Sequence, residues 1–99
     1  MIIVGGTFEL DPTQRDAFLA GRLAMMRTSR AESGCLEYTF SADPLEPTRV
    51  LLYERWESQA ALDAHLARQK EGPRPDPDIR PVSASIVMYD VAAERSFGR

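Results

Sequence analysis

The chain has 99 residues and a mass of 11.1 kDa, which is enough for one domain with a single hydrophobic core. Its hydrophobic fraction of 43% and charged fraction of 27% are ordinary for a globular protein, so a predominantly disordered chain is excluded. Twelve basic and fifteen acidic residues give a net charge of −3, which argues against a nucleic-acid partner. We therefore expect residues 1–99 to form a single domain.

Side chains able to form disulfides or bind metals are scarce. The chain has one cysteine, Cys35, and one histidine, His65, so neither an internal disulfide nor a Cys/His zinc site can form within it. No run of about eighteen apolar residues is present, and the first residues lack the basic region of a signal peptide. These features predict a cytoplasmic protein with no membrane partner and no metal site.

The predicted elements begin with a strand. The segment from Ile2 to Glu9 is rich in β-branched residues, and both of its faces are apolar enough for a central strand. The pair Gly5-Gly6 interrupts it, which predicts that another backbone or a ligand approaches closely there. The spacing of these glycines does not fit a phosphate-binding loop.

A helix is predicted next, from Pro12 to about Arg30. Asp11 is a suitable N-cap, Pro12 suits the first helical position, and Gly34 can end the segment. The apolar stripe expected for this helix consists of Phe18, Gly21, Met25 and Thr28. Its solvated face is expected to carry Arg15, Arg22 and Arg30.

Two alternating segments then predict an antiparallel hairpin. The first runs from Cys35 to Ala42 and the second from Arg49 to Glu57, with a proline-containing turn between them. In the second strand, alternation places four residues on one face: Val50, Leu52, Glu54 and Trp56.

A second helix and a fourth strand complete the pattern. Ser58 is a suitable cap for a helix from about Gln59 to Arg68, whose apolar stripe consists of Ala61, Leu62, His65 and Leu66. Residues 69–81 are rich in proline and predict an exposed loop, of a length that is often found in lids and binding elements. Ser83 to Val91 predicts the last strand, and residues 92–99 a tail.

The order β-α-β-β-α-β is the ferredoxin-like pattern of the α+β class, with a four-stranded antiparallel sheet and both helices on one face. Apolar residues occur on both sides of several strands, for example at Ile3 and Val4 and again at Leu51 and Leu52. A sheet face left bare to solvent is therefore unfavourable. We expect the open faces of two subunits to pair in a homodimer.

Three stretches of the chain carry a recognisable signature. They are Glu32-Ser33-Gly34-Cys35-Leu36-Glu37-Tyr38, Leu52-Tyr53-Glu54-Arg55-Trp56-Glu57-Ser58 and Ala61-Leu62-Asp63-Ala64-His65-Leu66. Together they resemble the antibiotic biosynthesis monooxygenase (ABM) family, and the Glu-x-Trp strand that leads into Ala-Leu-x-x-His is the most specific part. The resemblance implies a dimeric α/β barrel, in which two ferredoxin-like sheets pack face to face and each subunit holds a pocket between helices and sheet.

The resemblance also implies an activity. Members of the family oxygenate phenols, hydroquinones and anthrones without metal or flavin, because a deprotonated, electron-rich phenol can itself pass an electron to O2. The resemblance thus implies no cofactor, with a small aromatic substrate and O2 as reactants. Two positions depart from the pattern. Leu52 stands where anthrone-oxygenating members have an Asn, and the first strand lacks the Asn of haem-degrading relatives, which argues against haem breakdown.

His65 is the best candidate for a general base, because it is the only histidine, although a lone histidine on an apolar stripe is more often a buried packing residue. Trp56 and Tyr38 are expected to clamp a flat substrate, with packing as the alternative for Trp56.

Glu54 has two possible roles. If it faces the interior, it can orient His65 or the substrate; if it faces outward, it can pair with Arg49 or Arg55 across a dimer interface.

The rest of the pocket wall is predicted from apolar side chains, which are more often core than ligand contacts: Phe40, Phe18, Met25 and Leu52. Cys35 has no basic neighbour in the sequence, which indicates a packing role. The first functional hypothesis is a cofactor-independent monooxygenase of a small phenolic, quinol or anthrone-like compound. The alternatives are a proton-transfer isomerase or cyclase of a small carbonyl compound, and a non-catalytic ligand-binding dimer.

Overall fold

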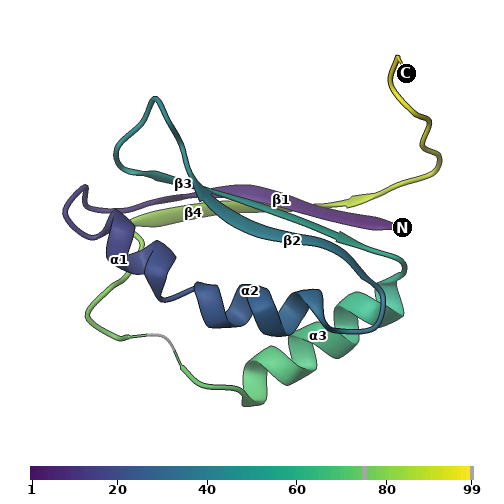
Figure 1. The fold of residues 1–99 in the computed structure, drawn as a ribbon, viewed down its shortest axis with the longest axis horizontal. Helices are drawn as coiled ribbons and strands as arrows, with labels where there is room; N and C mark the ends of the chain where they lie inside the picture. The colour runs from purple at the N-terminus through teal and green to yellow at the C-terminus, as the bar shows by residue number, and fades with distance from the viewer. Residues whose placement is uncertain (75, 99) are drawn as a thin grey trace.

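The computed structural model describes residues 1–74 and 76–98 (Figure 1). Its elements follow in the order β1 (Ile2–Glu9), α1 (Arg15–Ala20), α2 (Leu23–Arg30), β2 (Cys35–Ala42), β3 (Arg49–Trp56), α3 (Gln59–Glu71) and β4 (Ser83–Asp90). All four predicted strands are present. Residues 91–98 contain no helix or strand, and no helix of the described residues is long and apolar enough to cross a membrane.

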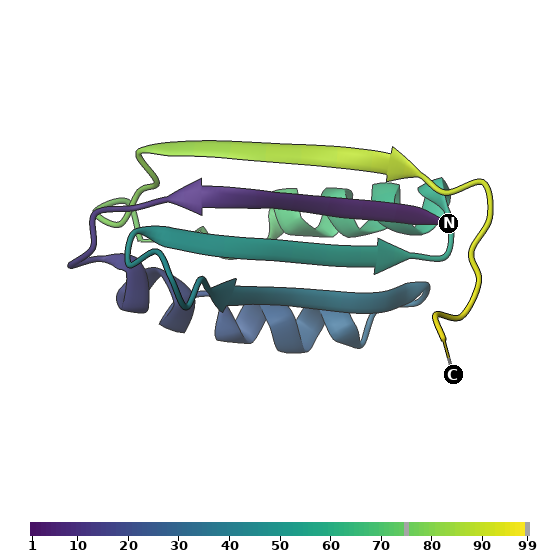
Figure 2. The ribbon, with the colours of Figure 1, turned by 90° about the horizontal axis from the view of Figure 1, so that it is seen from above.

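The strands form one antiparallel sheet in the order β2-β3-β1-β4 (Figure 2). The central strand β1 pairs with β3 from Ile2 opposite Trp56 to Glu9 opposite Arg49, and it pairs with β4 along its whole length. All three helices lie on the same side of the sheet (Figures 1 and 2). The predicted ferredoxin-like α+β fold is confirmed.

The glycine pair of β1 marks a close approach of another backbone. A Cβ atom on Gly6 would collide with the backbone of Ser85 and Ile86 in β4, whereas the same atom on Gly5 would lie 4.0 Å from the Leu52 carbonyl oxygen. The approach predicted at these glycines is therefore confirmed at Gly6, and the neighbouring strand makes it.

The single helix predicted over residues 12–30 is wrong, because the chain turns between α1 and α2. The backbone N–H of Gly21 donates to Ala17 and that of Arg22 to Leu19, both at 3.0 Å, which closes α1 before α2 begins at Leu23. Because of this break, the residues that face the core differ from those of the predicted stripe. Gly21 and Thr28 of the predicted stripe are exposed, and the buried residues are Phe18, Met26 and Ser29.

Two further boundaries differ from the prediction. The Asp11 carboxylate accepts hydrogen bonds from the Thr13 backbone at 2.8 Å and from its hydroxyl at 2.6 Å, so Asp11 stabilises a turn and the helix begins later, at Arg15. At the other side of the molecule, α3 continues to Glu71, and the first three residues of the predicted loop 69–81 are helical. The Ser58 cap is confirmed, since its Oγ accepts the Ala61 N–H at 3.1 Å.

Of the three arginines predicted on a solvated face, Arg30 is exposed as predicted, whereas Arg15 and Arg22 are half-buried. Arg15 donates to the Glu46 carbonyl at 3.2 Å, and Arg30 donates to the Tyr38 carbonyl at 2.8 Å. The Arg22 guanidinium carbon lies 4.1 Å from the centroid of the Phe18 ring. In each case the guanidinium group contacts another part of the same chain.

The hydrophobic core lies between the helices and the sheet. The alternation predicted for β3 is confirmed, because Leu51 and Tyr53 point away from the helices. The buried apolar residues of the core are Ile2, Val4, Leu10, Phe18, Met26, Tyr38, Phe40, Val50, Leu52, Trp56 and Leu62.

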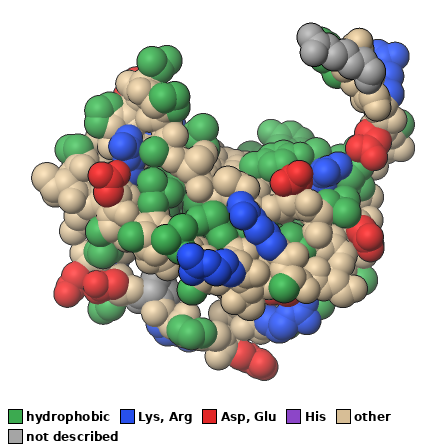
Figure 3. All heavy atoms as spheres, in the orientation of Figure 1, with side chains coloured by type: hydrophobic (Ala, Val, Ile, Leu, Met, Phe, Trp, Pro, Cys, Tyr) green, Lys and Arg blue, Asp and Glu red, His purple; other side chains and the backbone are tan. Residues whose placement is uncertain are grey.

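The opposite face of the sheet carries exposed apolar side chains. Leu51 and Tyr53 of β3 are 37% and 43% exposed, and Val87 and Tyr89 of β4 are 45% and 54% exposed. The loop between β2 and β3 and the C-terminal segment rise on either side of this face, with hydrophobic side chains between them (Figures 1 and 3). We call this surface, formed by Leu51, Tyr53, Val87 and Tyr89, the open face.

Candidate functional site

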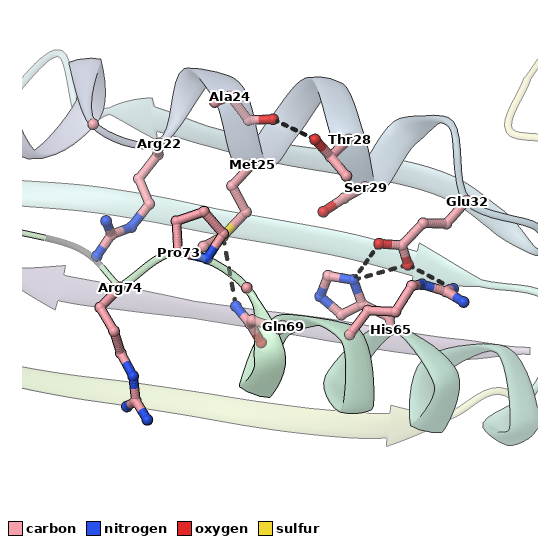
Figure 4. A pocket seen from close by; sticks show the side chains of 13 residues that line it. Arg22, Ala24, Met25, Thr28, Ser29, Glu32, His65, Gln69, Pro73 and Arg74 are labelled. Atoms are coloured by element: carbon pink, nitrogen blue, oxygen red, sulfur yellow. Dashed lines mark hydrogen bonds and ion pairs between the residues drawn. The ribbon is translucent and has the colours of Figure 1, made fainter.

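A cavity of about 240 Å³ lies between α2, α3 and the first residues of the loop that follows α3 (Figure 4). Met25 and Ser29 border it from α2, His65 and Gln69 border it from α3, and Pro73 from the loop. The proline-rich loop therefore contributes part of the wall of this cavity. We call it the helix cavity.

His65 borders the helix cavity and is held in place by Glu32. His65 Nδ1 lies 3.1 Å from Glu32 Oε2 and 3.3 Å from Oε1, and the two side chains are only 3% and 9% exposed. An ionised carboxylate can only accept hydrogen bonds, so in the neutral form of the His65 ring the proton belongs on Nδ1 and Nε2 presents a lone pair. Nε2 points away from Glu32, along the cavity (Figure 4).

A cation completes this arrangement. Arg68, one turn after His65 in α3, donates from Nη2 to Glu32 Oε2 at 3.0 Å. Glu32 thus has both a guanidinium and an imidazole N–H as partners, so the nearly buried carboxylate is compensated. Arg68 thus holds Glu32 in place, and Glu32 in turn fixes the orientation of the His65 ring.

Glu32 reaches His65 through the turn between α2 and β2. Its N–H donates to the Ser29 carbonyl at 3.0 Å just after α2 ends, and Gly34 then adopts a positive φ of 83°. A Cβ atom on Gly34 would collide with the Ala61 side chain of α3. A glycine at this position is therefore required both by the backbone angle and by the close approach of α3. Together these contacts bring Glu32 beside His65.

Trp56 lies behind His65, within the core. It is fully buried, its ring centroid lies 4.7 Å from that of His65, and its Nε1 donates to Glu54 Oε1 at 2.9 Å. Glu54 consequently faces the helix-covered interior, where its partner is an indole N–H.

The prediction that Glu54 pairs with Arg49 or Arg55 across a dimer interface is wrong. The alternation of β3 turns Glu54 toward the helices, and Arg49 binds Glu9 at 2.8 Å instead. Within residues 1–74 and 76–98 the hydrogen bond of the Glu54 side chain comes from Trp56 and not from His65, and a role for Glu54 in orienting the substrate stays a prediction.

Burial raises the pKa of the Glu54 carboxyl above its ordinary value, and the hydrogen bond from Trp56 and the nearby His65 only partly oppose this. Unfolding hydrates the group and returns its pKa to the ordinary value. Ionised Glu54 therefore costs stability, beginning as the pH rises through the unfolded pKa and reaching its full extent above the raised folded pKa.

We expect Glu54→Gln to increase the free energy of unfolding at pH 8. Glutamine keeps an acceptor for Trp56 Nε1 and removes the buried charge. The gain should shrink toward zero as the pH is lowered below the ordinary glutamate pKa, where the wild-type side chain is also neutral. Urea denaturation across this pH range measures the difference in the free energy of unfolding between the variant and the wild-type protein. A stability gain that grows at low pH would contradict the prediction.

A second cavity, of about 310 Å³, lies between α3 and the sheet, and four of the predicted site residues border it: Tyr38, Phe40, Leu52 and Glu54. Gln69 borders both cavities. The sulfur of Met25 accepts hydrogen bonds from the Tyr38 hydroxyl at 3.3 Å and from Gln69 Nε2 at 3.5 Å. Met25 and Gln69 therefore lie at the boundary between the two cavities.

Burial also raises the pKa of the Tyr38 phenol, so this hydroxyl stays protonated at neutral pH and acts as a hydrogen-bond donor. The Cys35 thiol has a raised pKa as well, because of burial and the carboxylates around it, which agrees with a packing role. Within residues 1–74 and 76–98, no three His, Cys, Asp or Glu side chains are grouped as ligands for a metal ion.

The predicted site residues are thus divided between two cavities. His65 and Met25 border the first, the four residues named above border the second, and Trp56 and Phe18 are fully buried without bordering either among the described residues. Trp56 stands behind His65 and not at the mouth of a pocket. Sequence reasoning missed the partner of His65, Glu32, although it belongs to the quoted signature.

The model of the family described as antibiotic biosynthesis monooxygenase matches residues 1–70 of the chain. The match covers more than half of the chain, which therefore belongs to the ABM family.

Two proteins of known sequence are similar to the chain. The chain is 32% identical over 93 residues to the uncharacterized protein sll1783 of Synechocystis, a match that covers 92% of this chain and 63% of the relative. It is 28% identical over 65 residues to YcnE of Bacillus subtilis, provisionally named a monooxygenase, covering 66% of this chain and 68% of YcnE.

A structure from Deinococcus radiodurans, provisionally named an antibiotic biosynthesis monooxygenase, superposes with a TM-score of 0.78 over the full length of both chains at 21% identity. This likeness supports the fold.

Proposed function

We propose that the protein is a cofactor-independent monooxygenase that acts on a small phenolic, quinol or anthrone-like compound. The observation that carries the proposal is the pair formed by His65 and Glu32, at 3.1 Å, on the wall of the helix cavity in a chain of this family. A neutral imidazole whose Nδ1–H is held by a carboxylate is suited to accept a proton at Nε2.

With anthrone as the substrate, the reaction begins when His65 Nε2 takes a proton from the activated CH2 group. The resulting anion passes one electron to O2, and the two radicals combine in a new C–O bond. Protonation by His65 gives a hydroperoxide, which loses the second C–H proton as its O–O bond breaks. The products are a ketone and water, so one atom of O2 enters each. The protein's tasks are to bind, deprotonate and shield the anion from water.

Burial supports this assignment. The His65 side chain is 3% exposed and lies against Trp56 at 4.7 Å and Tyr38 at 5.3 Å between ring centroids, so the base lies in aromatic surroundings. Tyr38, protonated and donating, is positioned beside Met25 at the boundary of the two cavities. Movement of Met25 or Gln69 would let one substrate contact both walls.

The test is O2 uptake by purified, metal-free protein with anthrone or 1,4-naphthohydroquinone, measured above the rate without protein. With ¹⁸O2, the organic product should carry one labelled oxygen atom. Turnover that continues without O2 would support a proton-transfer isomerase or cyclase. Binding of both compounds without turnover would support a ligand-binding protein.

We also propose that two copies of the chain pair through the open face. Four apolar side chains on this surface are between 37% and 54% exposed, while the loop between β2 and β3 and the C-terminal segment rise around them (Figure 1). Pairing would remove these side chains from water.

Light scattering coupled to size-exclusion chromatography should therefore give twice the 11.1 kDa mass of one chain. Tyr53→Arg, which places a charge in the open face, should shift the protein toward the monomer mass. Leu23→Arg is the matched control, because Leu23 is 47% exposed in α2, on the other side of the sheet. A wild-type protein that elutes as a monomer at micromolar concentration would rule out this dimer.

A further inference from the structure

The two ends of the helix cavity differ in charge. At one end, His65 and Glu32 face each other; at the other, Arg22 of the turn before α2 lies next to the loop that carries Arg74 (Figure 4). Both arginines border the cavity, and between the two ends its wall includes Met25 and Pro73. The cavity thus has an apolar middle and two polar ends.

The negative charge at the first end is already compensated. Glu32 accepts from Arg68 at 3.0 Å and contacts His65 Nδ1 at 3.1 Å. The positive charge at the second end is not. No hydrogen bond or ion pair joins the guanidinium of Arg22 or Arg74 to a carboxylate within residues 1–74 and 76–98. The cavity is therefore locally positive in a chain whose net charge is −3.

Arg22 differs from an ordinary surface arginine. Its guanidinium lies 4.1 Å from the Phe18 ring centroid, a cation–π contact that holds the charged group in a half-buried position. Burial lowers the pKa of this guanidinium, yet an arginine stays charged at neutral pH. Arg22 borders the cavity. Among the described residues, the side-chain nitrogens that are fully buried without a hydrogen-bond partner belong to Arg15 and Arg55, so those of Arg22 remain accessible. A held, charged and accessible fork of N–H donors is suited to a carboxylate.

We propose that Arg22 is the anion-binding end of the helix cavity, and that the ligand class is an aromatic carboxylate whose flat apolar body lies along Met25 and Pro73. The carboxylate accepts hydrogen bonds from Arg22, with Arg74 as a second cation at the rim. The remote part of the ring system then points toward His65. The proposal rests on the proposed function only for the reaction at the His65 end, and the binding itself is independent of turnover.

Isothermal titration calorimetry with two probes of the same shape tests this assignment. 2-Naphthoate should bind about tenfold more tightly than the neutral 2-naphthalenemethanol, because a charge-assisted hydrogen bond replaces a neutral one. Arg22→Met keeps an apolar stem over Phe18 and removes the charge, so it should abolish this preference and leave the affinity for the alcohol within about twofold. Arg27→Met is the matched control, since Arg27 is an exposed arginine of α2 that does not border the cavity.

Equal affinity of the wild-type protein for both probes, or an unchanged preference in Arg22→Met, would overturn the proposal. If Arg22→Met does not fold, NMR of the wild-type protein decides. Titration with 2-naphthoate should shift the Arg22 Nε–H signal more than that of Arg27, and equal shifts would count against the site. Turnover of neutral hydroquinones without naphthoate binding would leave the proposed function intact, whereas naphthoate binding without any O2 uptake would remove the function and keep the site.

Discussion

His65→Ala should lower the O2-dependent turnover of anthrone by about 100- to 10,000-fold, the contribution typical of a positioned general base. Among the described residues that border the cavity, no other group at that end is as well suited to accept the substrate proton. Glu32 is engaged by Arg68, and the Tyr38 phenol stays protonated because burial raises its pKa. The initial rate of O2 uptake, corrected for the rate without protein, measures the loss.

This variant also removes a buried ring, so its fold must be checked independently. His65 packs between Trp56 and Tyr38, with ring centroids at 4.7 and 5.3 Å, and alanine leaves a gap there. Added imidazole can fill the gap and accept a proton, so partial rescue of His65→Ala would separate a chemical role from packing. Lys70→Gln, on the exposed side of α3, is the matched control and should keep full activity. Turnover unaffected by His65→Ala would mean that His65 is a packing residue.

The fold could be predicted because its signals are local. Alternation in β3 separates Glu54 and Trp56 from Leu51 and Tyr53 within a single strand, and the Ser58 cap marks the start of α3 without any tertiary contact. The break between α1 and α2 could not be predicted in the same way. Gly21 is tolerated inside a helix at modest cost, so the turn depends on packing against the sheet, which no local pattern records.

The candidate site was only partly predictable for a related reason. His65 stood out as the single histidine, but its partner Glu32 lies 33 residues earlier in the chain and reaches it through the turn at Gly34. The sequence pattern places Arg22 on the solvated face of the predicted helix, together with Arg15 and Arg30. Its half-buried position over Phe18 depends on the same turn between α1 and α2 that the pattern failed to predict. Because the break between α1 and α2 was not predicted, the half-buried position of Arg22 was not predicted either.

Trp56→Ala should reduce the free energy of unfolding by about 3–5 kcal/mol, the range for truncating a large buried aromatic side chain. Trp56 is fully buried, supports the His65 ring and donates the hydrogen bond that compensates Glu54. Urea denaturation at pH 7 should be followed by far-ultraviolet circular dichroism, because the variant has no tryptophan left for fluorescence. A loss below about 1 kcal/mol would show that Trp56 is replaceable.

A small domain can lose most of its stability with such a change, so Trp56→Phe provides the second measurement. Phenylalanine retains much of the packing and removes the N–H, which leaves the Glu54 carboxylate buried without its donor. If that loss dominates, adding Glu54→Gln to Trp56→Phe should recover more stability at pH 8 than Glu54→Gln adds to the wild-type protein. Equal gains in the two backgrounds would instead assign the role of Trp56 to packing against His65 and the core. The double-mutant cycle therefore separates two roles of Trp56: the hydrogen bond that it donates to Glu54, and its packing against His65, the proposed base.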